Sequence, residues 1–317
     1  MYVVYMKTIL YFIIMIALGI LYEKFKIKFE NGDNNDMKTI IDKYLLKKDS
    51  TFKNKPFLWI HKNNDTNSKK WLDFGSRNTT NENSPYIELC IIKLIKTYGD
   101  YFNVVIVDDD SFKHLIPSFK LDLNNEPYPQ RKHIRRLMML KLIYLYGGIV
   151  CPKSFFPLND GLIGIYKQND VFAIENRYGV KTEDYMLPSI DFIGGKRFSP
   201  NIKPLISFLE NLNANDYTNE QDFLSLVNRH LKVLKSTFTI KTLDGKLSGV
   251  KDCNNNFITV EDLASESRID KKICSGAVGV FIPYDELEKR TRYNWITYLS
   301  KEDLLMSNTL LGDIMKH

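Results

Sequence analysis

The pattern of hydrophobic and polar positions predicts strands that alternate with helices. Residues 56–61 (PFLWIH) form a short apolar run typical of a buried strand, and residues 101–110 (YFNVVIVDDD) form a second run that ends in three aspartates. Between them, residues 84–99 place apolar side chains at helical spacing, with a proline near the start, where a helix tolerates it. Such alternation is typical of a mostly parallel sheet flanked by helices, so we expect an α/β fold.

The clearest helix-to-strand transition lies between residues 134 and 151. Apolar residues recur at helical spacing up to Leu145, and Gly147 and Gly148 then stop the helix. Residues 149–151 follow as a buried strand, which Pro152 closes. Further along we expect strands in 171–177 and 189–195, helices in 201–212 and 216–235, antiparallel strands with Asp-Gly and Asn-rich turns in 241–260, and closing helices in 284–305.

The first 22 residues carry a single charge, Lys7. A bilayer span takes roughly 20 mostly apolar residues, so we predict an uncleaved signal anchor and single-pass membrane localisation, with a cleaved signal peptide as the alternative. Basic and acidic residues are interleaved after the run, which leaves the side of the membrane open. The predicted organisation is a transmembrane anchor at 1–28, a polar stem at 29–55 and a globular domain at 56–317.

Composition excludes several classes of function. The 317-residue chain has a net charge of +6 with both signs mixed along its length, and it contains no helix-turn-helix, zinc-finger or RNA-binding pattern, so we expect no nucleic-acid partner. Its four cysteines lie far apart without a CxxC pair, which argues against a zinc site or a dense disulfide scaffold. No P-loop, HExxH or Ser-His-Asp order is present, so kinases, NTPases and hydrolases have no motif support.

Residues 135–158, RRLMMLKLIYLYGGIVCPKSFFPL, resemble the core of the DXD-type sugar transferases, such as yeast mannosyltransferases and capsular polysaccharide enzymes. In that family a helix ending in Tyr-Gly-Gly leads into a strand ending in Asp-x-Asp. Those aspartates bind a divalent metal and the diphosphate of the sugar nucleotide. Here the matching positions hold Pro152, Lys153 and Ser154. The order of elements matches over roughly 56–212, and residues 71–77 (WLDFGSR) also resemble uncharacterised giant DNA virus proteins.

The resemblance implies a GT-A-like fold and a glycosyltransferase that uses a nucleotide-sugar donor on a glycan, glycoprotein or glycolipid acceptor. It also implies Mg²⁺ or Mn²⁺ as cofactor. A family aspartate one helix length before Gly-Gly is matched here by Arg135. This chain therefore lacks acidic residues both there and at the Asp-x-Asp position, and the first of these places holds a cation instead. We therefore prefer metal-independent binding. The alternative is a catalytically inactive glycosyltransferase-like protein of a membrane or virion.

Five residues are candidates for nucleotide binding. Arg131 and Arg135 lie near a helix start and share a face, where they could grip a diphosphate, with Lys153 standing in for the metal. His61 ends the first strand and could contact the base, and Arg77 lies in an aromatic, glycine-containing loop. For the arginines, the alternative is a basic turn that faces solvent or pairs with the aspartates at 108–110. For His61, the alternative is a purely structural role.

Four carboxylates are candidates for catalysis or metal binding. Asp108 and Asp110 are the candidate metal ligands, because hard cations prefer carboxylate oxygens and alternate residues of a strand share a side. Asp109 and Asp191 are the candidate catalytic residues, and Asp191 falls on the acceptor side by resemblance. The alternatives are that Asp110 caps the helix that follows it and that Asp191 caps the glycine turn after it.

Overall fold

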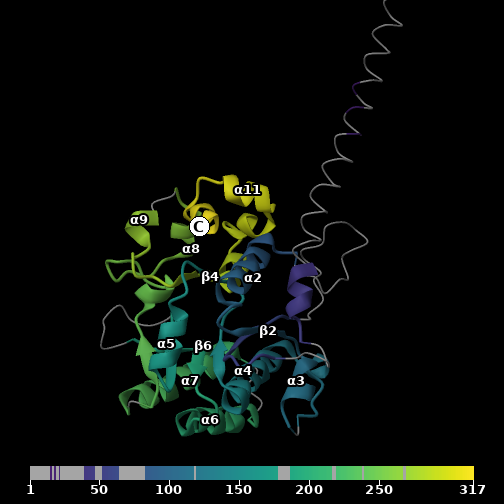
Figure 1. Cartoon of the computed structure of the whole chain (residues 1–317), viewed down its shortest axis with the longest axis vertical. Helices are drawn as coiled ribbons and strands as arrows, with labels where there is room; N and C mark the ends of the chain where they lie inside the picture. Colours follow the sequence, from purple (N-terminus) through teal and green to yellow (C-terminus); the bar gives the residue numbers. More distant parts are fainter. Residues whose placement is uncertain are drawn as a thin grey trace, which may run out of the picture. The chain divides into compact units, whose positions relative to one another are not determined.

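The computed structural model describes residues 39–46, 52–63, 83–117, 119–177, 186–215, 219–237, 239–266 and 269–317, and three single positions, Met15, Leu18 and Leu21. The chain divides into two compact units, Met1–Lys43 and Tyr44–His317, and the second contains the sheet (Figure 1). No helix within the described part is long and apolar enough to span a bilayer. The predicted anchor at 1–28 falls almost wholly outside the described residues and stays a prediction.

A six-stranded sheet in the order β2-β1-β3-β6-β5-β7 forms the centre of the second unit. Strand β1 pairs in parallel with β2 and β3, and β5 pairs in parallel with β7, whereas β6 runs antiparallel to β3 and β5. The predicted mostly parallel α/β sheet flanked by helices is confirmed. Its strands are β1 (Phe57–His61), β2 (Asn103–Val107), β3 (Gly148–Val150), β5 (Val171–Glu175), β6 (Pro188–Gly195) and β7 (Lys241–Leu243).

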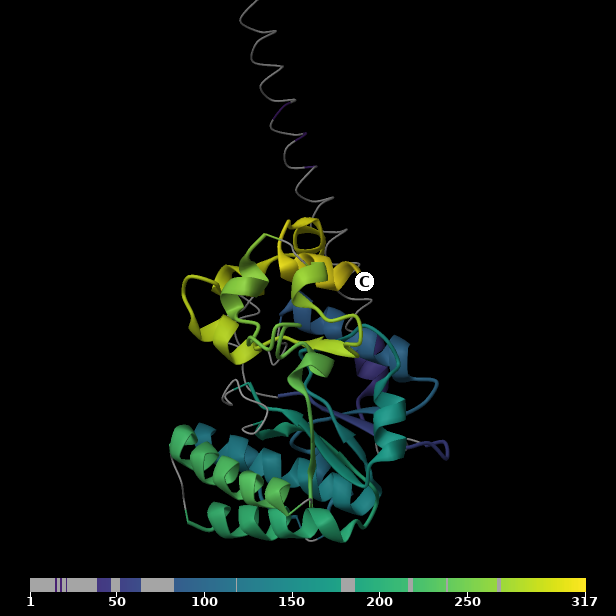
Figure 2. The same ribbon diagram turned by 90° about the vertical axis from the view of Figure 1, so that its left-hand side faces the viewer.

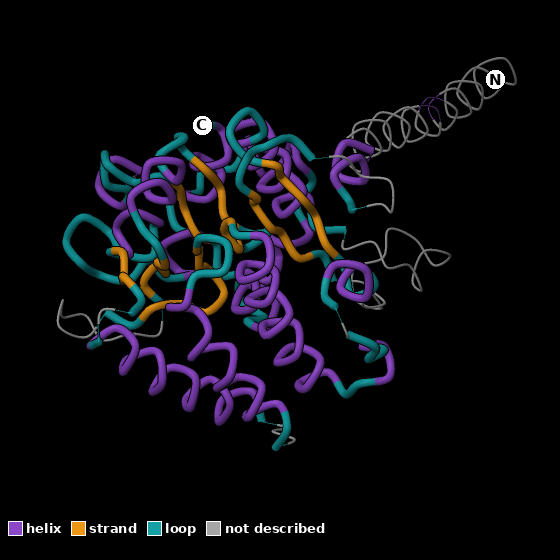
Figure 3. Tube along the Cα trace, turned by 60° about the horizontal axis from the view of Figure 1, so that its bottom comes forward, coloured by secondary structure: helices purple, strands orange, loops and turns teal. Residues whose placement is uncertain are grey.

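Three long helices, α4, α6 and α7, pack against one another, and α4 and α7 also pack against β6 (Figures 2 and 3). Leu137, Leu142 and Ile143 of α4 are buried in the core beneath the sheet, as the helical spacing of its apolar residues predicts. The helices in this part of the chain are α2 (Pro85–Tyr98), α3 (Ser111–Leu115), η2 (Leu123–Asn125), α4 (Tyr128–Tyr146), α5 (Leu162–Gln168), η4 (Pro200–Ile202), α6 (Lys203–Asn213) and α7 (Glu220–Ser236).

The C-terminal third follows its prediction only in part. The Asn-rich turn is present, since an antiparallel bridge joins Lys251 and Phe257 around it, and helices close this region. The first expected strand differs, because β7 joins β5 in parallel, and Asp244 accepts a hydrogen bond from the Lys246 amide and so caps a 3-10 helix rather than starting a hairpin turn. Strand β8 pairs instead with β4, far earlier in the chain. The elements here are β4 (Phe155–Pro157), η5 (Gly245–Ser248), α8 (Val260–Ala264), α9 (Ile269–Lys272), β8 (Gly279–Phe281), α10 (Tyr284–Lys289), η6 (Asn294–Tyr298), α11 (Lys301–Met306) and α12 (Leu310–Lys316).

Two cysteines that lie 21 residues apart in the sequence are bonded in this region. Cys253 and Cys274 form a disulfide whose Cα atoms are 5.2 Å apart. The bond ties the turn after η5 to the segment that follows α9. Cys90 and Cys151 remain as thiols, and both are buried, as expected for small core side chains.

The glycine pair after α4 allows β3 to lie beside β1. Gly147 and Gly148 have φ values of +74° and +111°, which favour glycine, and a Cβ on Gly148 would overlap the carbonyl oxygen of Phe57. The indole nitrogen of Trp59 donates to the carbonyl of Gly147 over 2.9 Å, which holds the end of α4 against β1. The predicted helix stop is thus also a place where the backbone of β1 leaves no room for a side chain on β3.

We expect Gly148→Ala to lower the free energy of unfolding by about 2–4 kcal/mol, because it combines backbone strain with a clash against Phe57. The matched control is Gly164→Ala in α5, where an added Cβ meets nothing within 4 Å. Since alanine favours a helix over glycine, the control should be neutral or stabilising by up to about 1 kcal/mol. Urea unfolding of both variants measures the difference, and equal stabilities would contradict the proposed close approach.

Candidate functional site

A cavity of about 840 Å³ opens at the edge of the sheet where β1, β3 and β5 end. Strand β1 leads through α2 to β2 on one side, whereas the chain later returns to place β3 on the other side. Chain segments that leave such neighbouring strands diverge, and ligands of open α/β sheets bind at that switch point. Strand β6 runs the other way, so its beginning, residues 189–192, lies at the same edge and also lines the cavity.

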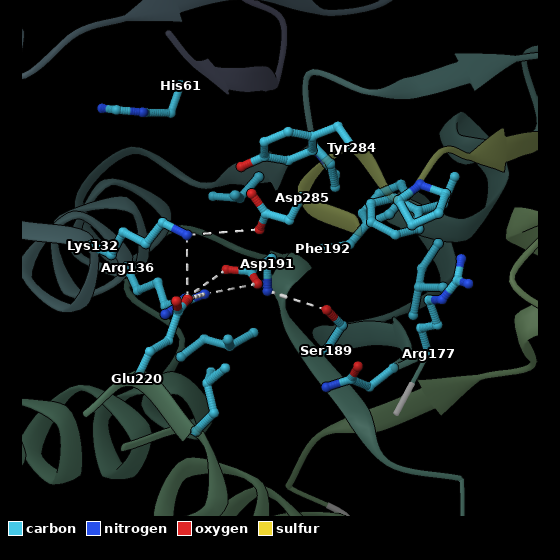
Figure 4. A pocket seen from close by; sticks show the side chains of 18 of the residues that line it. His61, Lys132, Arg136, Arg177, Ser189, Asp191, Phe192, Glu220, Tyr284 and Asp285 are labelled. Carbon is cyan, nitrogen blue, oxygen red and sulfur yellow. Dashed lines mark hydrogen bonds and ion pairs between the residues drawn. The ribbon is translucent and has the colours of Figure 1, made fainter. Parts of the chain in front are cut away.

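Three other elements complete the cavity wall (Figure 4). Helix α4 contributes Lys132 and Arg136, the start of α7 contributes Glu220, and the start of α10 contributes Tyr284 and Asp285. The side chains therefore come from segments far apart in the chain. They are brought together because α4 and α7 both pack on β6. Helix α10 joins them because it follows β8, and β8 pairs with β4, the strand that comes directly after β3 in the chain.

A buried salt bridge fixes α4 to the ends of β1 and β2. Arg135 donates from Nε and Nη2 to the two carboxylate oxygens of Asp109, over 2.8 and 2.6 Å. Nε2 of His61 lies 3.1 Å from the same carboxylate. Burial opposes ionisation of Asp109, but hydrogen bonds from Arg135 and His61 outweigh it and hold the pKa of this carboxyl well below its usual value. With Asp109 only 4% exposed, its carboxylate holds other side chains in place and does not face the cavity.

The three successive aspartates diverge. Asp108 accepts hydrogen bonds from the amide and hydroxyl of Ser111, so it is Asp108, and not Asp110, that binds the first turn of α3. Asp110 is largely exposed and pairs with Lys113 at 3.1 Å. Neither residue lines the cavity. The two candidate metal ligands therefore do not converge on one point.

The positions that match the family's metal ligands do not suit a divalent cation either. Pro152 and Lys153 line the cavity but offer no carboxylate oxygen, and the Lys153 ammonium lies 4.9 Å from the centre of the Tyr284 ring. Within the described part of the chain, no group of three or more His, Cys, Asp or Glu side chains is placed to hold a metal ion. The residues present thus do not fit the metal that the resemblance implies.

An ion-pair network runs across the cavity (Figure 4). Arg136 donates from Nε to Asp191 over 2.9 Å and from Nη2 to Glu220 over 3.3 Å. Lys132 lies 3.4 Å from the same Glu220 oxygen and 3.8 Å from Asp285. Burial opposes ionisation of Glu220, but the charges of Lys132 and Arg136 prevail and lower its pKa. The Asp191 carboxylate remains 54% exposed and accessible from the cavity.

Two further ion pairs hold the opposite wall. Glu175, at the end of β5, pairs with Lys251 at 2.5 Å, and both side chains are fully buried. Glu175 also accepts a hydrogen bond from the Gly245 amide, which ties β5 to η5. Arg177 pairs with Glu286 of α10 at 3.2 Å. Buried pairs of this kind hold the wall together at the cost of desolvation, so each depends on its partner.

The structure brings some of the predicted residues together and separates others. His61, Arg135, Lys153 and Asp191 line the cavity. Arg131 does not, since its guanidinium donates to the backbone carbonyls of Asn124 and Glu126 and holds the η2 turn. Arg77 lies outside the described residues.

Sequence reasoning missed Lys132, Glu220 and Asp285, and it gave no role of its own to Arg136. One signal was present, because Lys132 and Arg136 are four residues apart and so share one face of the helix. No local signal could have paired them with carboxylates from α7 and α10, which lie more than 80 residues away in the chain.

Comparison with known proteins adds no identification, since neither the protein-family models nor the curated proteins contain a match to this chain.

We expect Asp109→Asn to destabilise the protein by about 3–5 kcal/mol, because it removes the negative charge that pairs with the buried Arg135. Asp110→Asn is the matched control. Because Asp110 and Lys113 form an exposed pair, this change should alter stability by no more than about 0.5 kcal/mol.

The pKa of Asp109 is lowered from 3.8 in the folded state, so the contribution of this carboxylate to stability is present above about pH 4 and is lost as the pH falls. Chemical unfolding between pH 7 and pH 2 should therefore show a smaller acid loss in Asp109→Asn than in the wild type.

Proposed function

We propose that this protein is a membrane-anchored glycosyltransferase of GT-A-like fold, which moves a sugar from a nucleotide-sugar donor to a hydroxyl group of a glycan, glycoprotein or glycolipid. One observation carries the proposal: a cavity of about 840 Å³ at the switch point of a mostly parallel sheet. The segment that resembles the sugar transferases, residues 135–158, forms one side of that cavity through α4 and the residues after β3.

The size and chemistry of the cavity suit such a donor. Sites for ligands of this size are typically roughly 300–1,000 Å³, with apolar and aromatic walls and a few polar groups. Here Phe192, Phe281 and Tyr284 supply aromatic surface that a sugar or base could stack on. His61 stands at the rim for the base, and cations line the wall for the diphosphate.

Asp191 is the proposed catalytic carboxylate. It projects into the cavity from β6, is half exposed, and is oriented by Arg136. It would accept the proton of the acceptor hydroxyl or position that hydroxyl for attack. Asp109, the other carboxylate expected to be catalytic, supports the site by holding Arg135 and His61 and is proposed as a positioning residue.

The leaving diphosphate needs its charge neutralised, and we propose that side chains rather than a metal do this. Lys153 lies between the two positions that match the metal-binding aspartates and, together with Arg135, would supply positive charge near the donor. Arg77 remains a proposed contact on a loop outside the described residues, whereas Arg131 is engaged elsewhere.

A catalytically inactive glycosyltransferase-like protein of a membrane or virion is the second candidate. It is favoured by the loss of both aspartates at 152–154 and by the internal neutralisation of the cavity's charges. This alternative predicts ligand binding without turnover, or neither.

The disulfide supports a location for the domain. Disulfides persist in oxidising compartments and are rare in the cytosol, so Cys253 and Cys274 favour the non-cytosolic side of the membrane. Together with the apolar run at residues 1–22, this supports an anchor with an exported domain.

A panel of nucleotide sugars, incubated with full-length protein and an acceptor mixture with and without EDTA, tests the function. We expect donor-dependent transfer or donor hydrolysis that EDTA changes little. Asp191→Asn should lower kcat by about 10²–10⁴-fold with a smaller effect on the donor KM. Asp313→Asn, on the surface of α12, is the control. Absence of turnover with every donor would favour the inactive alternative, and loss of activity in EDTA would restore a metal requirement.

Thiol alkylation of protein purified without reductant tests the location. After denaturation we expect Cys90 and Cys151 to react directly and Cys253 and Cys274 to react only after reduction, as measured by mass spectrometry of peptides. Immediate alkylation of all four would place the domain in a reducing compartment.

A further inference from the structure

Two cations on one face of α4 share a single carboxylate oxygen. Nζ of Lys132 lies 3.4 Å and Nη2 of Arg136 lies 3.3 Å from Oε1 of Glu220. The two cations are four residues apart and project into the cavity side by side (Figure 4). The Glu220 carboxylate thus sits at a point where two positive charges converge, which is a position suited to an anion.

Arg136 keeps an unused donor. Its Nε binds Asp191 and its Nη2 binds Glu220, but its Nη1 is buried and finds no hydrogen-bond partner among the residues that the structure describes. A buried donor without a partner is costly, so such groups commonly mark the place of a missing acceptor. A phosphate offers more acceptor oxygens than a carboxylate and could engage this nitrogen in addition.

We propose that Lys132 and Arg136 form the binding site for the phosphates of the ligand, and that Glu220 occupies this site in the ligand-free protein. The proposal rests on the proposed function, because the diphosphate of a nucleotide sugar is the anion in question. Binding would be an exchange in which the phosphate oxygens take the two cations and the Glu220 side chain, already 27% exposed, turns towards solvent.

The charges favour this exchange over a purely structural tie. Glu220 is held ionised by its two cations, so it competes with a ligand as a full negative charge. A diphosphate carries more charge and binds the planar guanidinium through paired hydrogen bonds. Asp285 is the looser partner of Lys132, at 3.8 Å, and it would not need to move far. Glu220 is therefore a built-in competitor that sets the affinity of the site.

Isothermal titration with inorganic pyrophosphate, and separately with UDP, tests the assignment through effects of opposite sign. Glu220→Gln removes the competing charge and should tighten pyrophosphate binding by about three- to tenfold, while Lys132→Met should weaken it by about tenfold or more. Arg136→Lys keeps the charge but loses the paired donors, so it should also weaken binding. Lys141→Met is the control, since Lys141 lies on the same helix and pairs with Glu210 away from the cavity.

Thermal melts show whether each variant is folded, and only folded variants are compared. Unchanged or weaker binding in Glu220→Gln would overturn the exchange, and equal binding in the Lys132→Met and Lys141→Met variants would overturn the site. No pyrophosphate or UDP binding by folded wild type and folded Glu220→Gln would also overturn it.

The outcomes separate this proposal from the proposed function. If pyrophosphate binding follows the predicted order but no nucleotide sugar is turned over, the anion site stands and the transferase activity does not. If sugar transfer is observed while the Lys132 and Arg136 variants keep the wild-type affinity for UDP, the transferase stands and this anion site does not.

Discussion

The buried salt bridge between Arg135 and Asp109 is the interaction on which the cavity depends. It connects the first half of α4 with the end of β2, and through His61 it reaches the end of β1. Because both charges are nearly inaccessible to water, each is costly without the other, and the pair therefore holds the helix at one angle to the sheet edge. Lys132 and Arg136 flank Arg135 on α4, so their placement in the cavity follows from this attachment.

The cavity wall is held together by charges that compensate one another. Cations of α4 meet carboxylates from β6, α7 and α10, and a cation after β5 meets a second carboxylate of α10. Asp191 and Asp285 are partly exposed, so each pair is of modest strength, but a ligand that enters must still offer a better partner than the one it displaces. A polyanion such as the proposed diphosphate meets this requirement, and the resident carboxylates would then contribute to the specificity of the site.

The residues after β3 are where this chain differs in charge from the DXD-type sugar transferases that it resembles. Where the family has acidic residues, this chain has a proline, a buried lysine stacked on Tyr284, and a serine. As proposed above, a fixed positive charge at that point would take the place of the cation and would also repel one. In the proposal made above, a metal held at the end of this strand and a lysine in the same loop are two ways of placing positive charge beside the donor diphosphate.

The sequence by itself determined the elements whose physics is local. The apolar runs of β1 and β2, the helical spacing of α4 and its glycine stop were all readable, because burial periodicity and backbone conformation depend on neighbouring residues. The alternation of strands and helices also predicts that His61, Asp108–Asp110 and Lys153 lie at one edge, since parallel strands end together. His61 and Lys153 do line the cavity there, whereas the three aspartates do not. Only the tertiary structure decided which charges meet. Asp108, Asp109 and Asp110 are consecutive, yet one caps a helix, one is buried against Arg135 and one faces solvent. The partners Glu220 and Asp285 arrive from distant helices, and the parallel pairing of β7 and the disulfide of Cys253 with Cys274 likewise arise from long-range packing that no local pattern encodes.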